Sequence, residues 1–64
     1  MEKSIVKNAI DSMKEGGFNC MPITTYRDKG FQFKDTTRKM VEDANCQLKW
    51  LDTMKGGCWH IIPN

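Results

Sequence analysis

Four side chains of this sequence could take part in thiol or metal chemistry. They are the three cysteines and the single histidine, namely Cys20, Cys46, Cys58 and His60. Zinc sites use closely spaced ligand pairs such as C-x-x-C, and the sequence has no such pair. On a strand, Cys58 and His60 would share one face, with roughly 6–7 Å between their backbones. No third residue is evident to orient the imidazole, so we expect neither a Cys–His nucleophile nor a metal site.

Motifs for other catalytic chemistries are also missing. The sequence contains no G-x-S-x-G, no H-E-x-x-H, no phosphate loop and no glycine-rich dinucleotide turn. The carboxylates Glu42, Asp43 and Asp52 are expected on the exposed side of a helix, where they would act as solubilising charge. We therefore predict a protein that is not an enzyme and needs no cofactor or metal.

A run of cationic residues between positions 27 and 39 indicates a binding chemistry instead. Five Lys and Arg residues stand against Asp28 and Asp35, so the local charge is 5 − 2 = +3, compared with +2 for the whole chain. Such clusters bind phosphates through counterion release, although lysines on a sheet edge also serve simply to discourage aggregation. Exposed tryptophans are favoured at interface hot spots. The candidate partner-binding residues are Arg27, Lys29, Lys34, Arg38, Lys39 and Trp50.

The first element that must position these residues is a helix over residues 2–15. Its apolar residues recur at spacings of three and four, which places them on one helical face. Gly16-Gly17 supplies the flexible residues that end such a helix. The apolar stripe consists of Ile5, Val6, Ala9, Ile10 and Met13.

A β-hairpin is predicted next, with strands over residues 18–27 and 31–34 and a turn at 28–30. Strand-forming residues and Gly30 favour this interpretation, whereas Pro22 restricts the first strand to an edge or to the residues after the proline. A three-residue loop would pair Arg27 with Phe31. A four-residue loop would pair Tyr26 with Phe31, and the aromatic cross-strand pair favours this longer loop.

The segment Lys29-Gly30-Phe31-Gln32-Phe33 resembles part of the aromatic signature of RNA-recognition domains. In that family the two rings lie on an open sheet face, which would turn Gln32 and Lys34 into the core here. Burying unpartnered polar groups costs about 1–3 kcal/mol each, so we reject this family. The alternation instead predicts that Phe31 and Phe33 face inward while Gln32 and Lys34 face outward.

A second, longer helix is predicted from Asp35 or Thr36 to about Lys55, where Gly56-Gly57 repeats the stop signal. Trp50 would lie about 120° from the centre of its apolar stripe, at 100° per residue, either covered by the first helix or the C-terminal strand or exposed to solvent. A strand over residues 58–62 follows, with Trp59 in the core. If it is uncovered, this strand is an edge suited to strand addition. The stripe consists of Met40, Val41, Ala44, Leu48, Leu51 and Met54.

Together these elements predict a single α+β domain over residues 1–64, with two helices packed on one face of a two- or three-stranded sheet in the order α-β-β-α-β. The chain has 64 residues, 39% hydrophobic and 28% charged, which indicates one small globular unit. No apolar run is long enough to span a membrane or to serve as a secretory signal. An odd number of widely spaced cysteines favours a reducing compartment, so we expect a cytoplasmic location and no membrane partner.

The function expected from these features is non-enzymatic binding. A short chain that begins with Met and lacks catalytic motifs is typical of phage and plasmid accessory proteins that act as inhibitors or adaptors. We expect it to modulate, most simply inhibit, a larger protein or protein complex with an acidic surface. The alternative is a small nucleic-acid-binding regulator that uses its basic edge on phosphates. A homodimer formed through an open sheet edge is a third expectation.

Overall fold

The chain begins with helix α1, Glu2–Gly16, in the computed structural model, which describes all of residues 1–64. The helix ends at Gly17, whose left-handed φ of 69° a residue without Cβ adopts readily. The N–H of Phe18 then donates to the carbonyl oxygen of Met13 (2.9 Å), which completes the cap. Val6, Ile10 and Met13 are buried, as the apolar stripe predicted. The predicted helix and its stop signal are therefore confirmed.

The predicted hairpin is wrong, because only one short strand forms in this part of the chain. Strand β1 covers Met21–Ile23, and residues 31–34 form no strand. The turn itself is present, since the N–H of Phe31 donates to the carbonyl oxygen of Asp28 (3.0 Å). Tyr26 and Phe31 also meet, with ring centroids 4.6 Å apart, although no strand pairing holds them. The backbone of β1 pairs with the C-terminal strand instead.

The predicted second helix is also wrong beyond its first two turns. Helix α2 covers Asp35–Asp43, and Asn45 then adopts a φ of 60°, which a continuing helix cannot accommodate. The following residues form strand β2, Cys46–Thr53. In a strand, side chains at every second position share one face of the sheet. Gly56-Gly57 does not end a helix. It begins strand β3, Gly56–Pro63, after a two-residue turn.

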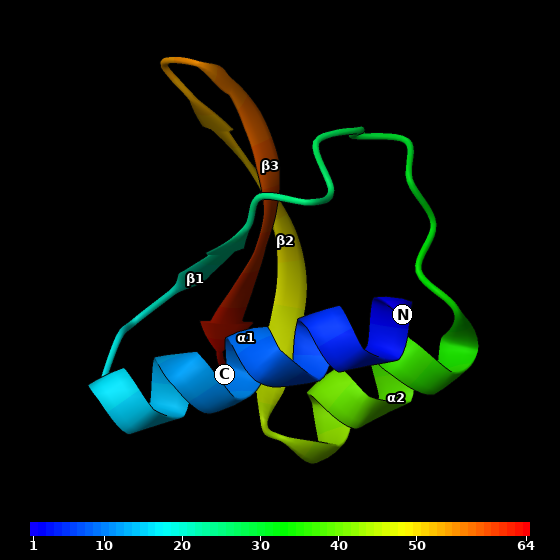
Figure 1. Ribbon diagram of the computed structural model, residues 1–64, viewed down its shortest axis with the longest axis vertical. Helices are drawn as coiled ribbons and strands as arrows, with labels where there is room; N and C mark the ends of the chain where they lie inside the picture. Colours follow the sequence, from blue (N-terminus) through cyan, green and yellow to red (C-terminus); the bar gives the residue numbers. More distant parts are fainter.

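The three strands form one antiparallel sheet in the order β1-β3-β2 (Figure 1). Strand β3 is central and paired on both sides, so the C-terminal strand is not the edge that it would have been if left uncovered. The α+β class is confirmed, with two helices beside one three-stranded sheet. The order along the chain is α1, β1, α2, β2, β3 rather than α-β-β-α-β, because residues 46–53 rather than 31–34 supply a strand.

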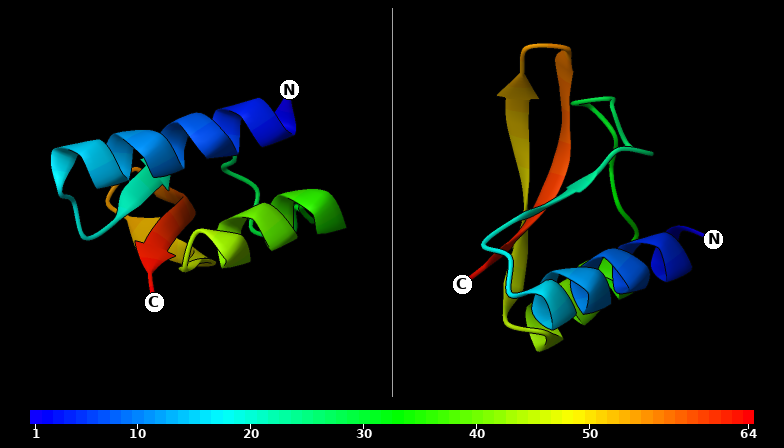
Figure 2. Two further views of the ribbon diagram at one scale, coloured as in Figure 1. Left: turned by 90° about the horizontal axis from the view of Figure 1, so that it is seen from below. Right: turned by 60° about the vertical axis from the view of Figure 1, so that its left-hand side comes forward.

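The core lies between the helices and one face of the sheet, here called the inner face. Figure 2 (left) shows α1 and α2 side by side, and both contribute buried side chains to the same cluster. The β2–β3 hairpin extends beyond the helices, so its tip has no helix against it (Figure 1). The buried cluster consists of Val6, Ile10, Met13, Ile23, Phe33, Val41, Cys46 and Ile61.

The carboxylate of Glu2 links the two helices. Its Oε1 accepts hydrogen bonds from the Lys34 N–H (2.9 Å) and the Thr37 hydroxyl (2.6 Å), so α1 caps the first turn of α2. The expected cap at Asp35 or Thr36 is wrong, since Lys34 is the N-cap residue and makes no side-chain cap bond. Burial alone would raise the pKa of Glu2. The two hydrogen bonds and the positive charges of Lys34 and the N-terminus outweigh it, so the pKa lies below its ordinary 4.5.

Candidate partner-binding surface

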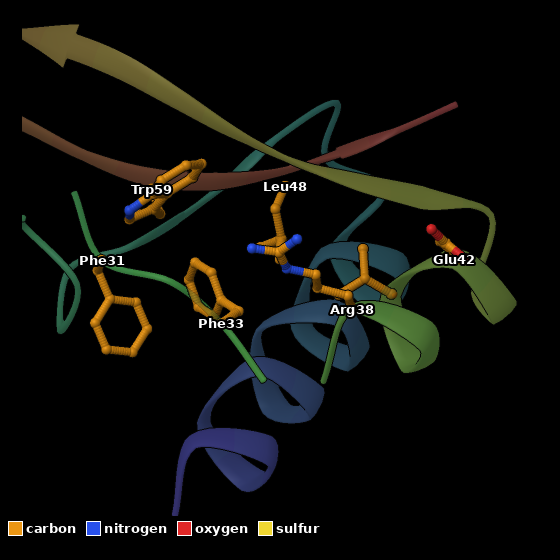
Figure 3. Close-up of a pocket in the computed structure, with 7 residues that line it drawn as sticks. Phe31, Phe33, Arg38, Glu42, Leu48 and Trp59 are labelled. Atoms are coloured by element: carbon orange, nitrogen blue, oxygen red, sulfur yellow. The ribbon is translucent and has the colours of Figure 1, made fainter. Parts of the chain in front are cut away.

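A groove of about 330 Å³ opens between α2, β2 and the loop that leads into α2 (Figure 3). The guanidinium of Arg38 lies beneath Leu48 in the middle of the view, between the aromatic rings on one side and the carboxylate of Glu42 on the other (Figure 3). Five of the seven lining residues are hydrophobic, so the groove combines an apolar wall with one cation. We call it the Arg38 groove. Its lining consists of Phe31, Phe33, Arg38, Val41, Glu42, Leu48 and Trp59.

A chain of aromatic contacts forms one wall of the groove and fixes the loop to the sheet. Phe31 meets Phe33 edge-on at 4.9 Å between ring centroids, and Phe33 meets Trp59 at 5.5 Å. The indole N–H of Trp59 donates to the carbonyl oxygen of Asp28 (3.0 Å), which ties the turn to β3. Burial among these rings, followed by the charge of Glu2, raises the pKa of Tyr26 above 10.0.

The sidedness predicted for residues 31–34 is confirmed. Phe33 is buried in the core and Phe31 is half-buried against it, whereas Gln32 and Lys34 are exposed. The apolar side of this loop therefore faces the interior. Neither ring is available as an open platform on which a nucleic-acid base could stack, which is the arrangement of RNA-recognition domains.

The five predicted cations are all exposed, but they do not form one patch. Arg27 and Lys29 lie in the turn next to Trp59, and Lys34 is the N-cap residue of α2, beside Glu2. Arg38 and Lys39 are neighbours in sequence, yet successive helical residues diverge by 100°. Arg38 enters the groove, whereas Lys39 lines a separate depression between the helices with Lys3, Thr36, Met40 and Asp43.

Trp50 lies on β2 rather than on a helix, so the helical position expected for it is wrong. Its ring packs edge-on against Trp59 of β3 at 5.9 Å between centroids, and its indole N–H donates to Oδ1 of Asp52 (2.9 Å). Trp50 is half-buried, and the cover comes from the C-terminal strand. Gly57 lies against the same ring, because a Cβ there would stand 2.8 Å from Cζ2 of Trp50.

Cys58 and His60 do come together, on the outer face of β3. The Sγ of Cys58 is 3.8 Å from Nδ1 of His60, and both residues are buried. Nδ1 also lies 3.0 Å from the Cys58 carbonyl oxygen. A carbonyl oxygen can only accept, so this contact is a hydrogen bond in the tautomer that carries the proton on Nδ1, and in that tautomer Nδ1 has no lone pair for the thiol proton. Cys46 is buried and Cys20 is exposed, and no three His, Cys, Asp or Glu side chains gather as a metal site would require.

Sequence reasoning missed the free edge of β2 and the role of Gly57 beside Trp50. One signal for the strand was present, because Cys46, Leu48 and Trp50 recur at every second position. The turn residues Met54-Lys55 followed by two glycines were a second signal, consistent with a hairpin as well as with a helix end.

Comparisons with known proteins do not contribute to the interpretation of this surface. No protein-family model, curated protein or solved structure matches this chain. Neither helix is long and apolar enough to cross a membrane.

Proposed function

We propose that this protein is a small non-enzymatic binding protein that modulates, most simply inhibits, a larger macromolecular partner by occupying its surface. The observation that supports this proposal is the sidedness of the segment from residue 27 to residue 39. The side chains of Phe33 and Thr37 are buried, while every cation of the segment is exposed. Cations held outward by a packed loop and helix favour a partner with an acidic surface. The contact residues of the proposal are Arg27, Lys29, Lys34, Arg38, Lys39 and Trp50.

The proposal is tested by capturing the partner from extracts of the source cell with charge-reversed variants. Arg27→Glu with Lys29→Glu reverses the two cations of the turn and takes the formal net charge from +2 to 2 − 4 = −2. Lys7→Glu with Lys14→Glu makes the same change of charge on exposed positions of α1 and is the matched control. We expect one stoichiometric protein to be retained by the parent chain and the control and lost by the turn variant. Equal retention by both variants would contradict the proposed surface.

Nucleic acid is the second candidate partner, and the same exposed cations favour it. The test is binding of the parent chain to a random duplex and a random single strand over a range of salt. Phosphate contacts give a log–log slope of about −0.7 to −0.9 for each phosphate neutralised. Absence of binding at about 50 mM salt eliminates this alternative, since phosphate binding is strongest at low salt.

A further inference from the structure

The long edge of the sheet leaves a regular row of backbone groups without partners. The N–H of Asn64 donates to the carbonyl oxygen of Asn45 (2.9 Å), and hydrogen-bonded pairs alternate along an antiparallel ladder. Odd-numbered residues of β2 therefore bond to β3, and the even-numbered ones direct N–H and C=O away from it. A second hydrogen bond supports this alternation. The N–H of Trp59, which stands opposite Trp50, donates to the carbonyl oxygen of Tyr26 (3.0 Å) and so points away from β2. The free groups of β2 belong to Leu48, Trp50 and Asp52, since the carbonyl oxygen of Cys46 already accepts a hydrogen bond from Nδ2 of Asn64 (3.4 Å).

These free groups lie on residues whose side chains face inward. Leu48 and Trp50 stand opposite Ile61 and Trp59, which belong to the inner face. A strand added antiparallel to β2 would therefore place its own inward-facing residues directly beside them, about 5.5 Å away between Cα atoms. Long edges without proline or a bulge are templates for such pairing, and β2 has neither over residues 46–53.

The sequence of β2 fits a second copy of itself in one register. With Trp50 opposite Trp50 of the second copy, residues 47–53 pair, and Lys49 stands opposite Leu51. Shifting two residues one way puts Lys49 opposite Lys49, where like charges repel. Shifting two residues the other way pairs residues 49–53 alone, with Leu51 opposite itself. The register centred on Trp50 is thus the longest that avoids facing lysines.

This register also brings opposite charges together across the pairing. It places Asp52 of the second copy beside Leu48, on the face where the Arg38 guanidinium lies (Figure 3). Within one chain, Leu48 and Asp52 are four residues apart on the strand, or about 13 Å. The Asp52 of the same copy therefore does not lie beside Leu48. Glu42 and Lys49 are the other charged groups nearby. The Glu42 carboxylate lies on the side of Arg38 away from Phe31 and Trp59, one helical turn along α2, and Lys49 points to the outer face.

We propose that the protein forms a two-fold dimer in which β2 pairs with β2 of a second copy, giving a continuous six-stranded sheet. Asp52 of each copy faces the Arg38 groove of the other, so the charge pair is made twice. Arg27, Lys29 and Lys39 lie outside the paired strands, and both copies would present them to a larger partner. The dimer would cover Arg38 and Trp50, two contact residues of the proposed function, and would leave that function to the cations outside the paired strands. Sedimentation of the chain alone tests the dimer, whereas capture with the Arg27 and Lys29 variant tests the function, so either can fail without the other.

The test is the mass of the parent chain and of charge variants in sedimentation equilibrium. We expect the parent chain to pass from 7.4 kDa toward twice that mass between micromolar and millimolar concentration. Arg38→Asp alone and Asp52→Arg alone each create two like-charge contacts, so each variant stays monomeric. Mixed in equal amounts, the two variants form a heterodimer in which both contacts are again of opposite charge. Circular dichroism checks that both variants keep the fold.

Amide hydrogen exchange locates the contact on the chain. The amides of Leu48, Trp50 and Asp52 exchange fast in dilute solution and slow down as the dimer forms, while Gln47, Lys49 and Leu51 are protected throughout. Four results would overturn the proposal: a parent chain that stays monomeric at millimolar concentration, single variants that still dimerise, a variant mixture that stays monomeric, or slowed exchange that does not alternate along β2.

Discussion

The two edges of the sheet differ in length and in proline content, two features that control strand addition. Strand β1 is three residues long and contains Pro22, whereas β2 is eight residues long and contains no proline. A helix lies against each strand, α1 against β1 and α2 against β2. Pro22 stands opposite His60, and an N–H at this position of β1 would point away from β3. The proline therefore removes a free donor from the outer edge of β1 without breaking a hydrogen bond between β1 and β3. One edge is thus blunted and the other is available. The difference favours β2 over β1 as the edge at which the proposed dimer would form.

Both edges depend on the same central strand. Ile61 is fully buried and stands between Met21 of β1 and Leu48 of β2. Beyond the helices (Figure 1), the hairpin of β2 and β3 is held by its own ladder, by the contact between Trp50 and Trp59, and by the hydrogen bonds of Trp59 to the loop. Substitutions along β3 therefore separate what stabilises the whole sheet from what stabilises the β2 edge.

The largest effect is expected from Gly57→Ala, which acts on the β2 edge. The new Cβ would lie 2.8 Å from Cζ2 of Trp50 and 3.0 Å from the carbonyl oxygen of Leu51, at a φ of +153°. Overpacking and backbone strain together should lower the free energy of unfolding by about 3–4 kcal/mol, measured by urea denaturation. Gly56→Ala is the control, because its φ is also positive but no atom lies within 4 Å. A similar loss in both variants would mean that strain alone acts.

A somewhat smaller loss is expected from Ile61→Ala, which acts on both edges at once. Truncating a fully buried isoleucine removes its apolar contacts and leaves a cavity, at a cost of about 3 kcal/mol in urea denaturation. Ile62→Ala on the outer face is the matched control and should cost about 1 kcal/mol, since that residue is only half-buried. An equal loss in the two variants would show that the inner face is no better packed than the outer one.

The same contrast explains what local sequence could predict. In α1 the helical spacing and the stop at Gly17 agree, so the element was predictable. In the segment after α2, Leu48 fits both a stripe with Ala44 and Leu51 and an alternation with Cys46 and Trp50. What decides for the strand is pairing with β3, a contact between distant residues that no local pattern encodes.

The candidate surface was predictable to a similar extent. Polar alternation sufficed to predict that Phe31 and Phe33 face inward and that the cations face outward. It could not predict that Arg38 enters a groove while Lys39 does not, because this depends on which side of α2 meets β2. The free edge was equally hidden, since it follows from the strand order and not from any single strand.

The smallest effect is expected from Pro22→Val, which probes what blunts the β1 edge. The substitution restores an outward N–H in β1. It also loses the restriction that proline imposes on the unfolded chain, so stability should fall by less than about 1 kcal/mol. If the shortness of β1 and the cover of α1 suffice to protect the edge, the variant sediments with the same mass as the parent chain at every concentration. Assemblies larger than those of the parent chain would instead assign the protection to the proline, and the two edges would then differ by one residue rather than by their architecture.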